Sequence, residues 1–148
     1  MSAEVSSVGD AVTGERPWKI LGIHHVAFAH GDGGPSDALA NLLGLQCAHM
    51  EQADGFDEEM VPVGDSALQL LSATGPGVVT KFLERRGPGL HHVALRVDDV
   101  AAITHDLCGR GVEMVDRAPR PGGAGTLIAF AHPRAFGGML VEFVEDRP

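Results

Sequence analysis

Two histidine doublets carry the strongest chemical signal in this sequence of 148 residues. His24-His25 and His91-His92 lie 67 residues apart, and each doublet stands in a stretch that alternates as β-strands do. Imidazole nitrogens bind divalent cations, so histidines on equivalent strands indicate a metal site. A single histidine in a strand is more often a hydrogen-bonded core or surface residue, and the interpretation therefore depends on what accompanies the doublets.

The doublets belong to a longer internal repeat. Residues 22–32 return as residues 89–99, with Gly, His, His, Val, Ala and the final Asp matching in place. The chain is therefore interpreted as two copies of one module, residues 20–75 and 88–146. Equivalent residues of the two copies can then converge across a pseudo-twofold axis.

A second pair of polar residues recurs near the end of each module. Gln69 and Glu142 occupy equivalent positions, and each interrupts an otherwise apolar strand. Either residue alone would be expected to face solvent, but recurrence at symmetric places favours a shared site. His25, Gln69, His92 and Glu142 are therefore the candidate metal ligands, a set of two nitrogens and two oxygens that leaves two coordination positions for water or substrate.

Strand alternation allows only one histidine of each doublet to face the cleft. If His25 points inward with Ala27, then His24 points outward with Val26 and Phe28, toward a helix layer. Periodicity does not choose between the two members. The small side chains of Ala27 and Ala94 leave room for a ligand, and this favours the second histidine of each doublet.

A carboxylate suited to proton transfer stands in the segment 55–60. Alternation puts Glu58 on one face with Phe56 and Met60, while Asp57 and Glu59 fall on the other. Apolar neighbours raise the pKa of a carboxyl toward a value useful for a general base. An equally good interpretation from spacing alone is that all three acids are solvated charges on an edge strand.

The elements that would position these residues follow a βαβββ order in both modules, which predicts an α+β fold. Strands are expected over 20–29, 45–50, 56–63 and 66–72, and again over 90–97, 112–116, 125–131 and 138–145. Helices are expected over 36–43 and 99–108, with a linking helix over 78–86. We predict one domain over residues 18–146, preceded by a flexible leader over residues 1–17.

Composition limits the possible functions. A hydrophobic content of 44% predicts a packed core, and a net charge of −9 argues against nucleic acid as a partner. No apolar run reaches the ~20 residues that a membrane span needs. The polar start and two cysteines, interpreted as reduced thiols, favour a cytoplasmic location.

The sequence resembles the methylmalonyl-CoA epimerases of the vicinal-oxygen-chelate (glyoxalase-like) superfamily over about residues 20–145. The resemblance rests on eight stretches, at 24–29, 43–45, 55–60, 68–71, 81–87, 89–94, 116–122 and 130–142. It implies a curved mixed sheet around a metal cleft. It also implies metal binding at His25, Gln69, His92 and Glu142, and an acid/base role for Glu58 with Glu142 as its partner across the substrate.

The resemblance also implies a reaction. The family interconverts (2R)- and (2S)-methylmalonyl-CoA by moving one proton through a metal-stabilised enolate. The divalent ion could be Co, Mn, Ni, Zn or Mg, and a homodimer is the family expectation. Departures from the family pattern over residues 29–36 and 48–56 keep a related acyl-CoA open as the substrate.

Two alternatives share this fold. One is another metal-dependent lyase or isomerase, such as a glutathione-dependent glyoxalase acting on a hemithioacetal. The other is a metal-free resistance protein that sequesters a small molecule. Sequestering proteins generally lack a complete metal set, so the metal content of the protein separates these classes.

Overall fold

The computed structural model describes residues 15–147, so most of the leader predicted over residues 1–17 lies outside the described part of the chain. The first module contains β1 (Ile20–His30), α2 (Ser36–Leu43), β2 (His49–Ala53), β3 (Phe56–Val63) and β4 (Ser66–Ala73). The helix α3 (Val78–Arg86) links it to the second module. That module contains β5 (Gly89–Val97), α4 (Val100–Gly109), β6 (Arg120–Pro121), β7 (Leu127–Ala131) and β8 (Val141–Glu145).

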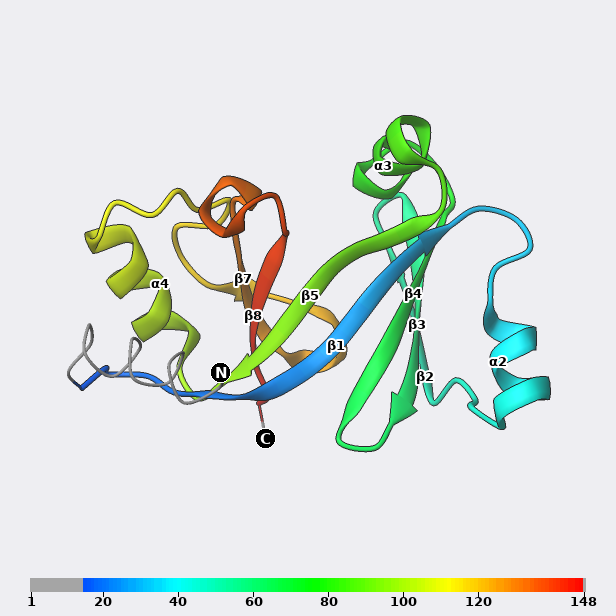
Figure 1. The fold of residues 1–148 in the computed structure, drawn as a ribbon, viewed down its shortest axis with the longest axis horizontal. Coiled ribbons are helices and arrows are strands. Elements are labelled where there is room, and N and C mark those ends of the chain that lie inside the picture. The colour runs from blue at the N-terminus through cyan, green and yellow to red at the C-terminus, as the bar shows by residue number, and fades with distance from the viewer. Residues whose placement is uncertain (1–14, 148) are drawn as a thin grey trace, which may run out of the picture.

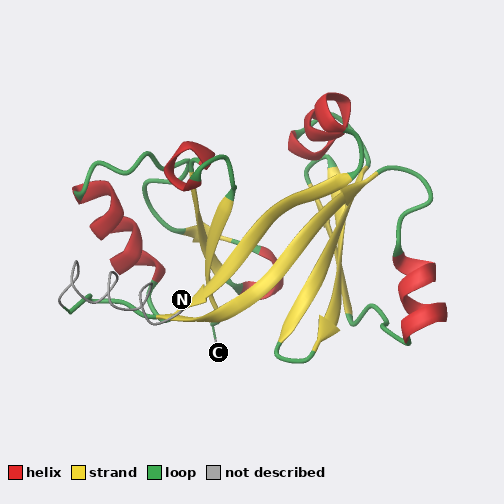
Figure 2. Ribbon diagram, viewed as in Figure 1, coloured by secondary structure: helices red, strands yellow, loops and turns green. Residues whose placement is uncertain are grey.

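All strands join one curled eight-stranded sheet in the order β2-β3-β4-β1-β5-β8-β7-β6 (Figure 1). The long strands β1 and β5 pair antiparallel at its centre, and each pairs in parallel with the last strand of its own module, β4 or β8. The helices α2 and α4 lie at opposite ends of the molecule, and α3 lies against one end of the central strands (Figure 2). This arrangement confirms the predicted α+β fold of two βαβββ modules around a curved mixed sheet.

Small residues allow the central strands to carry the site. Ala27 and Ala94 are fully buried, and the β1–β5 register places Ala27 opposite His92 and Ala94 opposite His25. The parallel pairs repeat this relation, since Ala27 lies beside Gln69 and Ala94 lies beside Glu142. Each alanine is thus flanked by two polar side chains, one on each neighbouring strand.

The helices differ in how firmly they pack. In α4, Asp99 accepts a hydrogen bond from the Ala102 amide at 3.0 Å, and Val100, Ile103 and Leu107 enter the largest core cluster. The linking helix α3, whose predicted bounds are confirmed, packs on the alanine face of β1. Within the described residues, α2 has the predicted bounds but buries no side chain.

Three strand predictions need correction. Residues 112–116 form only an isolated bridge, Met114 with Ala131, because Asp116 instead turns its carboxylate to the Phe130 amide at 2.9 Å. The edge strand β6 follows this turn and is short, since a proline has no amide hydrogen for a ladder. The strand predicted at 45–50 lies at 49–53, and the strand predicted at 138–145 begins at Val141, after a turn with two left-handed glycines.

None of the helices in residues 15–147 combines the length and apolarity that crossing a membrane requires.

Candidate metal centre and active site

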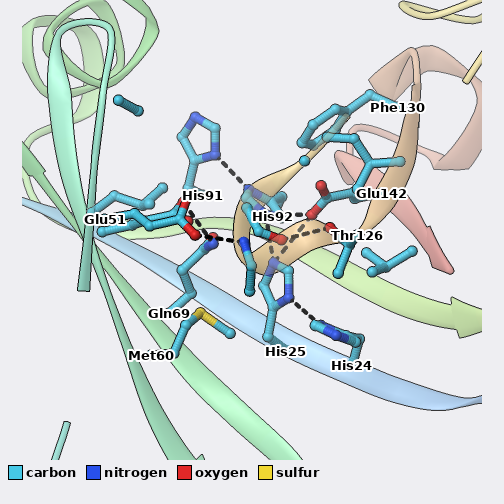
Figure 3. Close-up of a pocket in the computed structure, with 18 of the residues that line it drawn as sticks. His24, His25, Glu51, Met60, Gln69, His91, His92, Thr126, Phe130 and Glu142 are labelled. Carbon is cyan, nitrogen blue, oxygen red and sulfur yellow. Dashed lines mark hydrogen bonds and ion pairs between the residues drawn. The ribbon is translucent and has the colours of Figure 1, made fainter. Parts of the chain in front are cut away.

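Three of the four candidate ligands converge on one point. The Nε2 atoms of His25 and His92 lie 3.1 Å apart, and each lies 3.1 Å from Oε1 of Glu142 (Figure 3). All three side chains are buried, and their ligand-type atoms fall within 4.8 Å of one another. Two imidazoles and a carboxylate in such a cluster are donor groups that suit a divalent cation.

Gln69 lies on the first-module side of the same cavity. Its amide nitrogen donates to Oε2 of Glu58 at 3.1 Å, which orients the amide. Its Oε1 is buried and has no hydrogen-bonding partner among residues 15–147. A buried carbonyl oxygen without a donor is costly, and a cation would satisfy it. The four residues therefore fit a metal ion of mixed nitrogen and oxygen ligation.

The carboxylate of Glu142 is held ionised by its neighbours. Burial alone would raise its pKa, but the imidazoles of His25 and His92, each with Nε2 3.1 Å from Oε1, lower the pKa well below the usual range of a glutamate. The second module therefore supplies a negative charge where the first supplies the neutral amide of Gln69. A cation bound through Nε2 of both histidines would have one carboxylate and two imidazoles as ligands, a set that carries one negative charge.

Glu58 has a different environment. It projects from β3 into the cavity and is only 9% exposed. Burial raises its pKa above the usual value, and the negative charge of Glu51 raises it further. Phe56 and Met60 line the same cavity, as the alternation of the strand predicted. These surroundings suit a carboxylate that takes up and returns a proton.

The cavity that holds these groups has a volume of about 420 Å³ and is built by both modules. A turn at residues 122–125 closes one side. The Ala124 amide in this turn donates to Glu51 Oε1 at 2.6 Å, which ties the second module to the edge strand β2 of the first. Gly123 lies so close to Glu58 that a Cβ there would clash with Oε1 of that residue. Sequence reasoning interpreted these glycines only as a turn.

The first histidine of each doublet, His24 or His91, is called here the outer histidine. The outer histidines do not follow the predicted alternation. His24 and His91 also line the cavity, and each touches the neighbouring histidine of its doublet. The β1–β5 register shifts beside both doublets, between Ile23 and His25 and between Ala27 and Phe28. These shifts leave His24 and His91 without a partner in the register and break strict alternation.

In the first module the predicted helix layer is on the other side, because α3 covers the face that carries Ala27. In the second module α4 packs with Leu95 and Val97, on the face that alternation assigns to His91, as predicted.

Both outer histidines are held neutral. Burial lowers the pKa of His24, and the nearby His25 lowers it further. Burial lowers the pKa of His91 to about 4, with an added contribution from His92. Neutral rings can accept hydrogen bonds, which a charged imidazolium cannot do.

Comparison with known proteins agrees with this geometry. Residues 24–130 match the family described as the glyoxalase/bleomycin resistance protein/dioxygenase superfamily. The chain therefore belongs to this superfamily.

Within the superfamily, several proteins that it matches along most of their length are methylmalonyl-CoA epimerases. The ethylmalonyl-CoA/methylmalonyl-CoA epimerase of Cereibacter sphaeroides is 30% identical over 126 residues, which cover 81% of this chain and 94% of that protein. The crystal structure of methylmalonyl-CoA epimerase from Mycobacterium tuberculosis aligns with a TM-score of 0.81 and 34% identity, covering 87% of this chain and 90% of that one.

A third match carries a ligand. A variant of Streptomyces coelicolor methylmalonyl-CoA epimerase in complex with 2-nitronate-propionyl-CoA aligns with a TM-score of 0.81 and 30% identity. The alignment covers 88% of this chain and 100% of that one.

Proposed function

We propose that the protein is a metal-dependent epimerase that interconverts (2R)- and (2S)-methylmalonyl-CoA, or a closely related acyl-CoA, by proton transfer at carbon 2. The observation that carries the proposal is the hydrogen bond from Gln69 to Glu58. It links a buried carboxylate with a raised pKa to a cluster of metal-ligand atoms in one cavity. Similarity to methylmalonyl-CoA epimerases supplies the substrate class.

The metal would be held by His25, Gln69, His92 and Glu142. When bound, a divalent cation supplies the positive charge that lowers the cost of forming a thioester enolate. Two imidazoles, an amide and one carboxylate suit Co, Mn, Ni, Zn or Mg, and this donor set does not select among them. Gln69 also holds Glu58 in place, because its amide donates to Oε2 of that residue.

Glu58 would remove the proton at carbon 2. Its raised pKa makes it a stronger base than an exposed glutamate, and its side chain is largely buried. We assign the opposite face of carbon 2 to Glu142, which belongs to the other module. With one epimer, ionised Glu142 would take up the carbon-2 proton while Glu58, whose raised pKa lets it carry a proton, returns one on the other face. With the other epimer, Glu58 would take up the proton and Glu142 would return the one it had gained. In that assignment Glu142 serves both as ligand and as acid or base.

The proposal includes a homodimer in the cytoplasm. The helix α2 supports the dimer, because Leu42 is 79% exposed and Leu43 is 66% exposed, which leaves an apolar surface available to a second copy. Two unpaired cysteines, Cys47 and Cys108, suit a reducing compartment. Light scattering of the protein and of Leu42→Asp tests the dimer, and fractionation of the source cells tests the location.

Loss of the carbon-2 proton in D₂O tests the activity. Proton NMR would follow the carbon-2 proton of (2R,S)-methylmalonyl-CoA in three samples. These contain the Co²⁺-loaded protein, the protein stripped of metal, or the variant Glu58→Gln. We expect rapid exchange that needs the metal and falls about 10³-fold in Glu58→Gln. The matched control is Glu59→Gln, one residue along the same strand, where the carboxylate accepts a hydrogen bond from Ser36 outside the cluster.

Each alternative gives a different outcome. A protein that binds Co²⁺ but exchanges no carbon-2 proton contradicts the epimerase and points to another reaction of the superfamily. A protein that binds no divalent ion contradicts the metal site and points to a metal-free binding protein.

A further inference from the structure

The two histidine doublets have the same internal geometry. The Nδ1 atoms of His24 and His25 lie 2.7 Å apart, and those of His91 and His92 lie 2.8 Å apart. The ring planes cross at 76° in the first doublet and 77° in the second. This contact recurs in both modules, so it is a property of the repeat and requires an explanation in terms of protons.

A hydrogen bond between two imidazole nitrogens holds one proton. His25 and His92 direct Nε2 at the cluster with Glu142, and a nitrogen that binds a cation carries no proton. A neutral ring with a free Nε2 is protonated at Nδ1. His25 therefore donates from Nδ1 to Nδ1 of its neighbour, and His92 does the same. The outer histidines are then protonated at Nε2.

The two chains of hydrogen bonds end differently. Nε2 of His24 lies 3.1 Å from Oδ1 of Asp146, and Nε of Arg96 donates to the other oxygen of that carboxylate at 3.0 Å. The ring of His91 instead packs on Phe82, with centroids 4.9 Å apart. Only a carboxylate end strengthens the donation along its chain, since hydrogen bonds to ionised groups are stronger than neutral ones.

We propose that the outer histidine of each doublet is a positioning residue that fixes the tautomer and ring orientation of the metal-binding histidine, and that Asp146 strengthens this support in the first module alone. The inference rests on the proposed metal site. In this role His24 and His91 act on the metal through His25 and His92. Outer partners of this kind typically change metal affinity by about 10- to 100-fold when they are lost.

The tautomers can be observed directly. Long-range ¹H–¹⁵N NMR of the full chain, labelled with ¹⁵N-histidine and loaded with Zn²⁺, distinguishes a protonated nitrogen from a free or ligating one. We expect protonated Nδ1 on His25 and His92 and protonated Nε2 on His24 and His91. Ligation through Nδ1, or an outer ring protonated at Nδ1, would overturn the inference while leaving the metal site intact. Failure to take up Zn²⁺ would overturn both.

Metal affinity tests the asymmetry. We expect Asp146→Asn to weaken Co²⁺ binding about tenfold, with native circular dichroism. Asp65→Asn is the matched control, because it makes the same charge change in a residue whose carbonyl accepts a hydrogen bond from the same Arg96. This control should bind Co²⁺ as the unaltered protein does, whereas equal losses in the two variants would show a general charge effect and overturn the role of Asp146.

Variants of His24 separate support of the ligand from simple packing. His24→Phe removes the acceptor, whereas the amide oxygen in His24→Gln can still accept from Nδ1 of His25, so the glutamine variant should retain more affinity. In the His24→Phe background, Asp146→Asn should have no further effect on Co²⁺ binding, because the connection is already broken. Additive losses, or unchanged affinity and cobalt absorption spectrum in His24→Phe, would contradict the proposal.

Discussion

The two modules share a scaffold and differ in their chemistry. Each places a histidine beside the other's central alanine, and each adds one polar residue from its last strand. The first module contributes neutral Gln69 and the buried acid Glu58, whereas the second contributes charged Glu142 and a glycine turn. Symmetry therefore brings four candidate ligands together, while the differences separate a carboxylate with a lowered pKa, Glu142, from one with a raised pKa, Glu58.

The same contrast appears in the helices. The helix α4 buries Val100, Ile103, Thr104 and Leu107 against its half of the sheet, whereas α2, in the equivalent position, buries no side chain within the described residues. Helical stability in proteins comes largely from such packing. The second module should therefore contribute more to the stability of the monomer, and α2 is free to contact another surface.

Making the two modules alike should abolish the charge asymmetry of the site. Glu142→Gln should weaken Co²⁺ binding at least about 100-fold, because a unit charge at ~4 Å contributes about 4 kcal/mol at an effective dielectric of ~20. Isothermal titration calorimetry checks this. Adding Gln69→Glu should restore part of the affinity but not proton exchange, because the new carboxylate repels Glu58. Unchanged Co²⁺ affinity in Glu142→Gln would contradict its place in the site.

Replacing one apolar side chain of each helix by alanine should reveal how differently the two helices pack. Ile103 in α4 is 1% exposed, so Ile103→Ala should lower the free energy of unfolding by about 2–5 kcal/mol. Leu42 in α2 is 79% exposed, and Leu42→Ala should change the stability of the monomer by less than about 0.5 kcal/mol. Urea unfolding at several protein concentrations measures both values. Equal losses at low concentration would show that α2 packs on its own module.

The effect of the glycine turn on Glu58 can be tested against a glycine elsewhere in the chain. Gly123→Ala should lower the rate of carbon-2 proton exchange at least about tenfold, because its Cβ would displace Glu58 or the turn, and small misplacements of reacting groups are costly. Gly109→Ala, where an added Cβ meets open space at the end of α4, should leave the rate unchanged. Equal rates for the two variants would show that the turn does not constrain Glu58.

The smallest effect concerns the pH profile. Glu58 must be ionised to accept a proton, and its raised pKa places the acid limb of activity above that of an ordinary glutamate. Glu51→Gln removes a like charge while keeping an acceptor for the Ala124 amide. The pKa of Glu58 should fall, moving the limb to lower pH by less than about one unit, since Glu51 is partly exposed. A limb that moves to higher pH would contradict this electrostatic coupling.

Much of the fold could be predicted from the repeat, because local alternation and duplicated glycines specify strands and their order. The segment 112–116 could not be predicted correctly. Its apolar residues suit a strand, but the Asp116 carboxylate bonds the Phe130 amide and the chain turns there. Such a contact joins residues distant in sequence, and no local pattern reports it.

For the site, too, some features could be predicted from the sequence and others could not. The sequence alone determined the four polar residues that the structure brings into one cavity, and it chose His25 and His92 because duplication marks equivalent positions and small alanines leave space beside them. Strict alternation misplaced His24, because register shifts in a strand pair depend on its partner.

Tertiary structure decided the remaining features of the site. It set the Nδ1 contacts within the doublets, the approach of Asp146 to His24, and the closure of Gly123 over Glu58. These contacts join residues of different strands and modules, and their distances are fixed only when the whole sheet curls. The sequence could thus supply the types of the reacting groups, whereas the protonation and orientation of those groups depend on neighbours that only folding brings near.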